Sequence, residues 1–152
     1  MSEMEVKPKG TLPTQFSVLL KNRAGALSSL VRLLHRAKIE VVGLSMQDSH
    51  DVSVARLVLS DPDLASQLFI EKGIAFNTCE LCVVALRDVN AGLSKCLDTL
   101  RAAETNVDFT YTLLCHPHGK TLLAMHLEDT FFGVSVLSSA GVQIVYEEDL
   151  LR

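Results

Sequence analysis

The feature of this chain that most constrains its fold is an internal repeat with a spacing of 66 residues. Residues 16–21 alternate apolar and polar side chains and lead through a polar turn into a Leu-rich segment that begins at Leu27. Residues 81–87 lead in the same way to Leu93. A fixed internal spacing sets the number of structural units before any single motif is interpreted. The 152 residues are therefore expected to form two similar small domains, 14–79 and 80–152, after a flexible lead-in at 1–13.

Hydrophobic periodicity predicts the order strand, helix, strand, strand, helix, strand in each copy. In the first copy, strands are expected near residues 14–21, 40–46, 53–59 and 74–78, with helices after Leu27 and Asp61. In the second copy, strands are expected at 81–87, 107–114, 121–127 and 142–147, with helices near 93–103 and 130–140. Gly73 and Gly141 end the second helix of each copy. The prediction is an α+β fold of two ferredoxin-like βαββαβ repeats, each an antiparallel sheet with helices on one face.

Composition narrows the classes of partner. The formal net charge is −4, whereas nucleic acids and anionic membranes usually require a basic surface. The third strand, Ser53–Leu59, has none of the aromatic side chains on which RNA-recognition modules stack bases. We therefore expect neither a nucleic-acid nor a membrane partner. The lead-in lacks the apolar run of a secretory signal, so the four cysteines are expected to be free thiols in the cytoplasm.

The strand–helix turn of each copy is the main candidate for a ligand site. Asn22 and Asp88 align at the start of the turn, and Gly25 and Gly92 lie near its end. Glycine lets a backbone approach a ligand, and free N–H groups at a helix start can bind a carboxylate. Asn22 or Asp88 would then hold a polar or cationic group. The alternative is that these two residues only cap the helices.

A metal site and a catalytic site are weaker candidates. Cys79 and Cys82 form a CxxC motif, but residues three apart on a strand point to opposite faces, so one ion is hard to share. Gly119-Lys120-Thr121 lacks the earlier glycine of a phosphate-binding loop, because position 114 is leucine. His126 alternates with apolar neighbours and is interpreted as structural. We expect no metal, no cofactor and no catalytic residue.

The turn sequences resemble those of a known family. Asn22-Arg23-Ala24-Gly25-Ala26-Leu27, followed by Leu30, Leu34 and Ile39-Glu40-Val41, is similar to the ACT domain pattern, in which Asp or Asn and then Pro-Gly-x-Leu open the first helix. Residues 87–93, with 105–108, resemble the same element in a second copy. Both copies depart from the pattern. The usual proline is Ala24 or Asn90, and the usual glycine is Ala91 in the second copy, which has Gly92 one position later.

The resemblance implies a non-enzymatic regulatory protein that binds a small effector, an amino acid, at interfaces between ACT domains. It assigns the contacts to Asn22, Arg23, Ala24, Gly25, Ala26 and Leu27, and to Asp88, Val89, Asn90, Ala91, Gly92 and Leu93. Asp108 and Tyr111 would be added from the second strand of a paired domain. A homodimer or higher homo-oligomer and a partner enzyme are expected. The alternative is an ACT-type subunit that associates with a biosynthetic enzyme without binding an effector itself.

Overall fold

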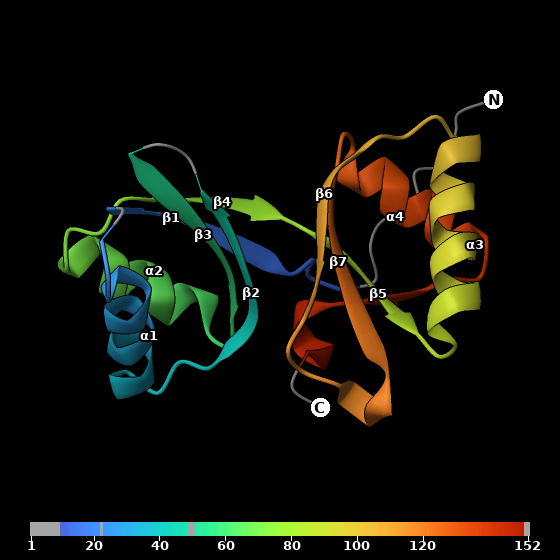
Figure 1. Ribbon diagram of the computed structural model, residues 1–152. Helices are drawn as coiled ribbons and strands as arrows, with labels where there is room; N and C mark the ends of the chain where they lie inside the picture. Colours follow the sequence, from blue (N-terminus) through green and yellow to red (C-terminus); the bar gives the residue numbers. More distant parts are fainter. Residues whose placement is uncertain (1–9, 22, 49–50, 151–152) are drawn as a thin grey trace. The chain divides into compact units, whose positions relative to one another are not determined.

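The computed structural model describes residues 10–21, 23–48 and 51–150, and they fall into two compact units. Thr14–Cys79 forms the first unit. Residues 10–13 and 80–150 belong to the second unit. Figure 1 shows a sheet and two helices in each unit. None of the helices in the described part of the chain is both long and apolar enough to cross a membrane.

The first unit has the predicted order of elements. Its elements are β1 (Thr14–Lys21), α1 (Ala26–Arg36), β2 (Val41–Asp48), β3 (Val52–Leu59), α2 (Pro62–Glu71) and β4 (Phe76–Glu80). The sheet has the order β2-β3-β1-β4, and β3 pairs antiparallel with both β1 and β2. Helix α2 begins where expected, because the Asp61 carboxylate accepts a hydrogen bond from the Leu64 N–H at 3.1 Å.

The second unit repeats that order with short additions. Its elements are β5 (Cys82–Leu86), α3 (Val89–Ala102), β6 (Val107–Thr112), η1 (Pro117–Gly119), β7 (Thr121–Leu127), α4 (Thr130–Ser139), β8 (Gln143–Val145) and η2 (Glu147–Asp149). The sheet order is β6-β7-β5-β8, with antiparallel pairs throughout. Two βαββαβ units with antiparallel sheets confirm the predicted ferredoxin-like fold.

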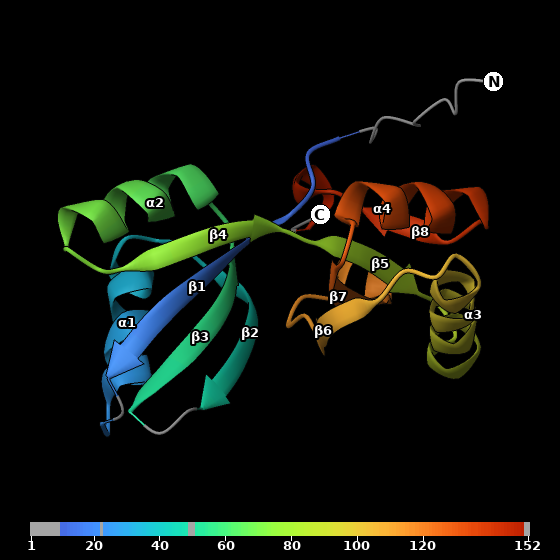
Figure 2. The ribbon, with the colours of Figure 1, turned by 90° about the horizontal axis from the view of Figure 1, so that it is seen from above.

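Alternation along β1 places both helices of the first unit on one face of its sheet (Figure 2). Phe16 and Val18 are fully buried and pack with Leu34 of α1 and Phe69 of α2. The Phe16 ring centroid lies 5.7 Å from those of Phe69 and Phe76, which are themselves 5.5 Å apart. Because alternate strand residues share a face, this aromatic trio joins β1, α2 and β4 into one core.

The core of the second unit is built on the same plan with different side chains. Cys82 and Met125 are buried on the strands, and Leu100 of α3 and Leu137 of α4 pack against them. Cys82, Leu137 and Ile144 occupy the positions where the first unit has its three phenylalanines. The second core is therefore aliphatic and sulfur-rich where the first is aromatic.

Strand register and helix ends agree between the units. The second strand of each sheet is interrupted by a register shift at the equivalent place, between Val41 and Gly43 and between Val107 and Phe109. The first helix of each unit ends at a non-glycine residue in the left-handed region. These residues are Lys38 (φ 61°) and Glu104 (φ 55°). The repeat is thus a repeat of backbone geometry.

Residues 10–13 differ from the flexible lead-in that was expected, because they pack on the second unit. The Leu81 N–H donates to the Pro13 carbonyl at 2.9 Å, and the Glu147 N–H donates to the Thr11 carbonyl at 2.8 Å. Leu12 is 4% exposed and belongs to the second core. The first unit is therefore inserted in sequence between two parts of the second.

Candidate functional site

Each unit has a cavity at the turn where its first strand enters its first helix. The first cavity has a volume of about 350 Å³ and is lined by residues 19–21, 23, 26, 29, 30, 33 and 73–75. The second cavity has a volume of about 460 Å³ and is lined by residues 85–88, 91, 92, 95 and 141–143. Most of these positions are equivalent under the repeat: 19–21 match 85–87, 26 matches 92, 29 matches 95, and 73–75 match 141–143. The fold therefore produces the same cavity twice.

Sheet order explains why a turn distant in sequence completes each cavity. The last strand of each unit lies beside the first strand, β4 beside β1 and β8 beside β5. In the second unit, Ala85 pairs with Gln143. The turn before each last strand contains a glycine with positive φ, Gly73 at 68° and Gly141 at 84°, a conformation that glycine adopts without steric cost. These turns line the cavity together with the start of the first helix.

In the first turn, backbone groups position the helix. Gly25 precedes α1 in a left-handed conformation (φ 85°) with no side-chain cap. Arg23 and Ala26 line the first cavity, whereas Ala24 and Gly25 do not. Leu27 packs against the core. Asn22, the residue predicted to hold a polar group of the ligand, lies outside the described residues.

In the second turn, Asp88 caps the helix. Its Oδ1 accepts a hydrogen bond from the Ala91 N–H at 3.3 Å, so α3 begins at Val89, earlier than the expected Leu93. Capping uses one lone pair, and a carboxylate has about four such positions, so Asp88 can also face a ligand. A Cβ at Gly92 would lie 3.1 Å from Leu86 Cδ2. The missing side chain at Gly92 therefore allows the helix to pack closely on β5.

The predicted residues of the second turn divide between the cavity, the solvent and the core. Asp88, Ala91 and Gly92 line the second cavity. Val89 and Asn90 are exposed on the first turn of α3. Leu93 packs against the core. The structure thus brings part of the predicted set together around one space.

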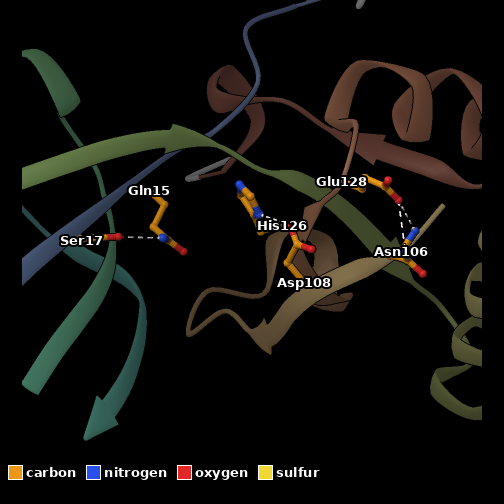
Figure 3. A network of polar contacts seen from close by, with 6 residues as sticks. All are labelled: Gln15, Ser17, Asn106, Asp108, His126 and Glu128. Carbon is orange, nitrogen blue, oxygen red and sulfur yellow. Dashed lines mark hydrogen bonds and ion pairs between the residues drawn. The ribbon is translucent and has the colours of Figure 1, made fainter. Parts of the chain in front are cut away.

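Asp108 and Tyr111 lie on β6 and do not line either cavity. Figure 3 shows the Asp108 carboxylate directed at His126, with Oδ2 and Nδ1 2.8 Å apart. The Phe109 ring stacks on His126 at 5.0 Å between centroids, and Tyr111 follows at 6.4 Å from Phe109. His126 therefore has a polar and a stacking contact within its own unit. A ligand contact from Asp108 or Tyr111 to a paired domain stays a prediction.

The cavities also contain charged residues that the predicted set omitted. Arg87 and Lys95 line the second cavity, and Lys21 lines the first. Gln143 also lines the second cavity. Its Oε1 accepts a hydrogen bond from Lys120 Nζ at 2.5 Å, which positions the Gln143 side chain. The signal available in the sequence was the cation that ends the first strand of both copies, Lys21 and Arg87, at the spacing of 66 residues.

The thiols are structural in the second unit. Burial, together with the nearby Cys96, raises the pKa of Cys82 to about 12. Burial raises the pKa of Cys96 to about 11. The Cys96 Sγ lies 3.9 Å from Met125 Sδ within the core. Across residues 10–21, 23–48 and 51–150, no three His, Cys, Asp or Glu side chains lie close enough together to hold a metal ion.

Comparison with known proteins gives one family and several similar folds. Residues 11–152 match the family model described as an ACT domain pair. The structure of protein BT0572 from Bacteroides thetaiotaomicron is similar, with a TM-score of 0.84 and 21% identity over 93% of this chain and 97% of that chain. The regulatory subunit of aspartate kinase from Thermus thermophilus, in its ligand-free form, has a TM-score of 0.56 and 10% identity over 87% of this chain and 94% of that one. No curated protein matches the sequence.

Proposed function

The chain belongs to the family of ACT domain pairs, and on this basis we propose that it is a non-enzymatic regulatory protein that binds an amino acid. Its fold is the regulatory ACT fold, similar to that of the regulatory subunit of an aspartate kinase. We place the amino acid in the second cavity. We also propose that the protein acts in the cytoplasm, where its four free cysteines stay reduced.

The observation that supports this proposal is the charge pattern of the second cavity. An amino acid carries an ammonium group and a carboxylate on the same carbon atom, so its site needs an acceptor and a cation close together. Asp88 supplies the acceptor, and Arg87 and Lys95 supply cations around the same space. Leu86 and Val142 add an apolar surface for a side chain. Both ends and the body of an amino acid therefore find complementary groups.

The position of Lys95 is favourable for this role. Its Nζ lies 3.6 Å from the point where a Cβ at residue 141 would be, so the Lys95 ammonium group lies beside the turn at Gly141. In this proposal, Lys95 and Arg87 bind the ligand carboxylate, and the free lone pairs of Asp88 accept from the ligand ammonium. Each charged hydrogen bond contributes about 1.5–3 kcal/mol when shielded from water and less at exposed groups such as these.

Binding would regulate by linkage. A ligand present at about 100 times its Kd stabilises the folded protein by about 2.7 kcal/mol. The protein can exist in an associated and a separate state. A ligand that binds one of these states more tightly shifts the equilibrium toward it, by the difference between its two binding free energies. We propose that the association involves a second copy of the chain, to which Asp108 and Tyr111 would contribute, and a partner enzyme.

A thermal-shift screen against the standard amino acids tests the proposal. At least one should raise the unfolding midpoint in a dose-dependent way. The charge-removing variant Asp88→Asn should reduce the rise, because asparagine still caps the helix but offers the ligand ammonium a neutral oxygen in place of a carboxylate. Asp88→Ala, which removes the cap and the acceptor together, should abolish it. A rise that is unchanged in both variants would place the amino acid elsewhere.

One observation favours the alternative of a subunit that assembles with an enzyme without binding an effector. Helix α4 has no charged residue and exposes Phe131 (56%) and Phe132 (46%). Exposed aromatic side chains that lie together are typical of protein interfaces. A flat response to all amino acids from normally folded protein would support this function instead. Replacement of both phenylalanines by serine should then abolish association with the partner enzyme, as measured by sedimentation of the mixture.

A further inference from the structure

We infer that the first cavity binds an apolar monocarboxylic acid without an ammonium group, of the class of branched 2-oxo acids. This inference rests on the proposed function, which places the amino acid in the second cavity. The two cavities lie at equivalent places and share most of their lining positions. A difference in their ligands must therefore come from the side chains at those positions.

The first cavity is more apolar than the second at equivalent positions. Three of its lining residues, Leu19, Ser29 and Ala75, occupy the places taken in the second cavity by Ala85, Lys95 and Gln143. A leucine replaces an alanine, and a cation and an amide are replaced by a small hydroxyl and a methyl group. Of the groups proposed to hold the amino acid in the second cavity, Lys95 is therefore replaced by Ser29, whereas Lys21 keeps a cation at the place of Arg87. Asn22, at the place of Asp88, lies outside the described residues.

The apolar wall of the first cavity is incompletely covered by the protein. Leu33 of α1 and Ile74 line this cavity and are only half-buried. A ligand with a branched apolar body would remove this surface from water, which is favourable in proportion to the area covered.

The charges of the first cavity determine which polar group accompanies that body. Its ionisable lining residues in the described chain are Lys21 and Arg23, and both are cations. They attract a carboxylate. The ammonium group of an amino acid would be placed beside two like charges, and no carboxylate among the described lining residues would compensate for it. A keto group is neutral and carries no such penalty.

Isothermal titration with two ligands of the same carbon skeleton tests this inference. The probe is 4-methyl-2-oxopentanoate, and the matched ligand is leucine, which has an ammonium group in place of the keto oxygen. We expect the 2-oxo acid to bind at least about tenfold more tightly than leucine does at this cavity, a difference of about 1.4 kcal/mol. No detectable binding of the 2-oxo acid at millimolar concentration would overturn the inference.

Variants locate the binding. The double variant Lys21→Gln/Arg23→Gln should weaken binding of the 2-oxo acid at least about tenfold, and Leu19→Ala, which installs the residue of the second cavity, should weaken it less. Arg32→Gln is the matched control, because Arg32 is an exposed cation on α1, a helix that lines the cavity with other residues but not with Arg32. Circular dichroism checks that each variant is folded. Binding that survives the double variant, or that Arg32→Gln weakens equally, would contradict the inference.

The two proposals fail separately. If an amino acid raises the unfolding midpoint through Asp88 but the 2-oxo acid does not bind, only the inference on the first cavity is wrong. If the 2-oxo acid binds through Lys21 and Arg23 but no amino acid binds, the proposed function of the second cavity is wrong.

Discussion

The first helices of the two units end in the same way but begin differently. Both end at a left-handed non-glycine residue, Lys38 or Glu104. In both, the next N–H bonds back to a carbonyl in the last turn, from Ile39 to Leu34 and from Thr105 to Leu100. At their starts, a left-handed Gly25 precedes α1, whereas the Asp88 side chain caps α3. The repeat is preserved where it serves the fold and has diverged where the cavities open.

This contrast separates the sources of stability from the sources of specificity. Register shifts, helix ends and the turns at Gly73 and Gly141 recur in both units, because backbone hydrogen bonds must be satisfied in the same way in each. The side chains on that backbone are free to change as long as the core stays filled. The same backbone arrangement can therefore enclose an aromatic core in one unit and an aliphatic core in the other. It can likewise form an apolar cavity in one unit and a charged cavity in the other.

The largest expected effect concerns the cores. Phe69→Ala should destabilise the first unit by about 3–5 kcal/mol, because it removes a fully buried ring that contacts two others. The equivalent change in the second unit, Leu137→Ala, should cost about 2–5 kcal/mol. Denaturant unfolding gives the size, and hydrogen exchange identifies the unit that loses protection. Loss of protection spread equally over both units would show that they do not fold as separate cores.

A glycine inside α4 gives a second test. A Cβ at Gly133 would lie 2.2 Å from Leu127 Cδ1, whereas the equivalent residue of the first unit is Ala65, which is fully buried. Gly133→Ala should therefore destabilise the second unit by about 1–3 kcal/mol through overpacking. Ala65→Gly, the reciprocal control, should cost about 1 kcal/mol because glycine disfavours a helix interior. A stabilising Gly133→Ala would mean that the two helices sit on their sheets in the same way.

Alkaline pH should weaken the second unit more than the first. Burial raises the pKa of Cys82 to about 12 and that of Cys96 to about 11, from the ordinary thiol value of 9.0. A raised folded-state pKa gives stability that is present below pH 9 and is lost as the pH rises toward the folded values. The loss from one such thiol is on the order of 1 kcal/mol at pH 10.

Urea unfolding at pH 8 and pH 10 measures this loss, and Cys82→Val provides the control. Valine has no titratable group, so the variant should lose less stability between the two pH values than the natural protein. A pH dependence that Cys82→Val leaves unchanged would assign the loss to other groups.

The smallest expected effect is at the shared helix ends. Lys38→Gly and Glu104→Gly should each stabilise the protein by about 0.5 kcal/mol, because glycine adopts a left-handed conformation without the cost that other residues bear, less its own loss of entropy. Thermal unfolding of the two variants measures the sign. If one variant were stabilised and the other destabilised, the two helix ends would not be energetically equivalent.

The order of helices and strands could be predicted from the sequence alone, because each element depends on a local pattern of residues. Alternation around Phe16, helical spacing from Leu27 and the capping signal at Asp61 each act within a few residues, and the structure confirms the elements they predict. Helix α3 begins at Val89, earlier than the expected Leu93, because Asp88 takes the capping role that was the alternative to ligand binding. Its role as a cap depends on the bond to Ala91.

The cavities and the place of residues 10–13 depend on tertiary contacts that have no local signal. Ala75 and Gln143 reach the strand–helix turns only because the last strand of each sheet lies beside the first. Leu12 gives no periodic pattern with its neighbours, and its burial in the second core follows from the pairing of Pro13 with Leu81. Such positions become visible only when the sheet order is known.

The central claim is that the two units share one backbone arrangement but have cavities that bind different ligands. Amide NMR titration of the natural protein tests it most directly, with 4-methyl-2-oxopentanoate and with the amino acid that gives the largest rise in the thermal screen. The account predicts that the 2-oxo acid shifts amides near residues 19–33 and 73–75, and that the amino acid shifts amides near 85–95 and 141–143. Equal shifts at both turns with either ligand, or shifts at neither turn, would contradict it.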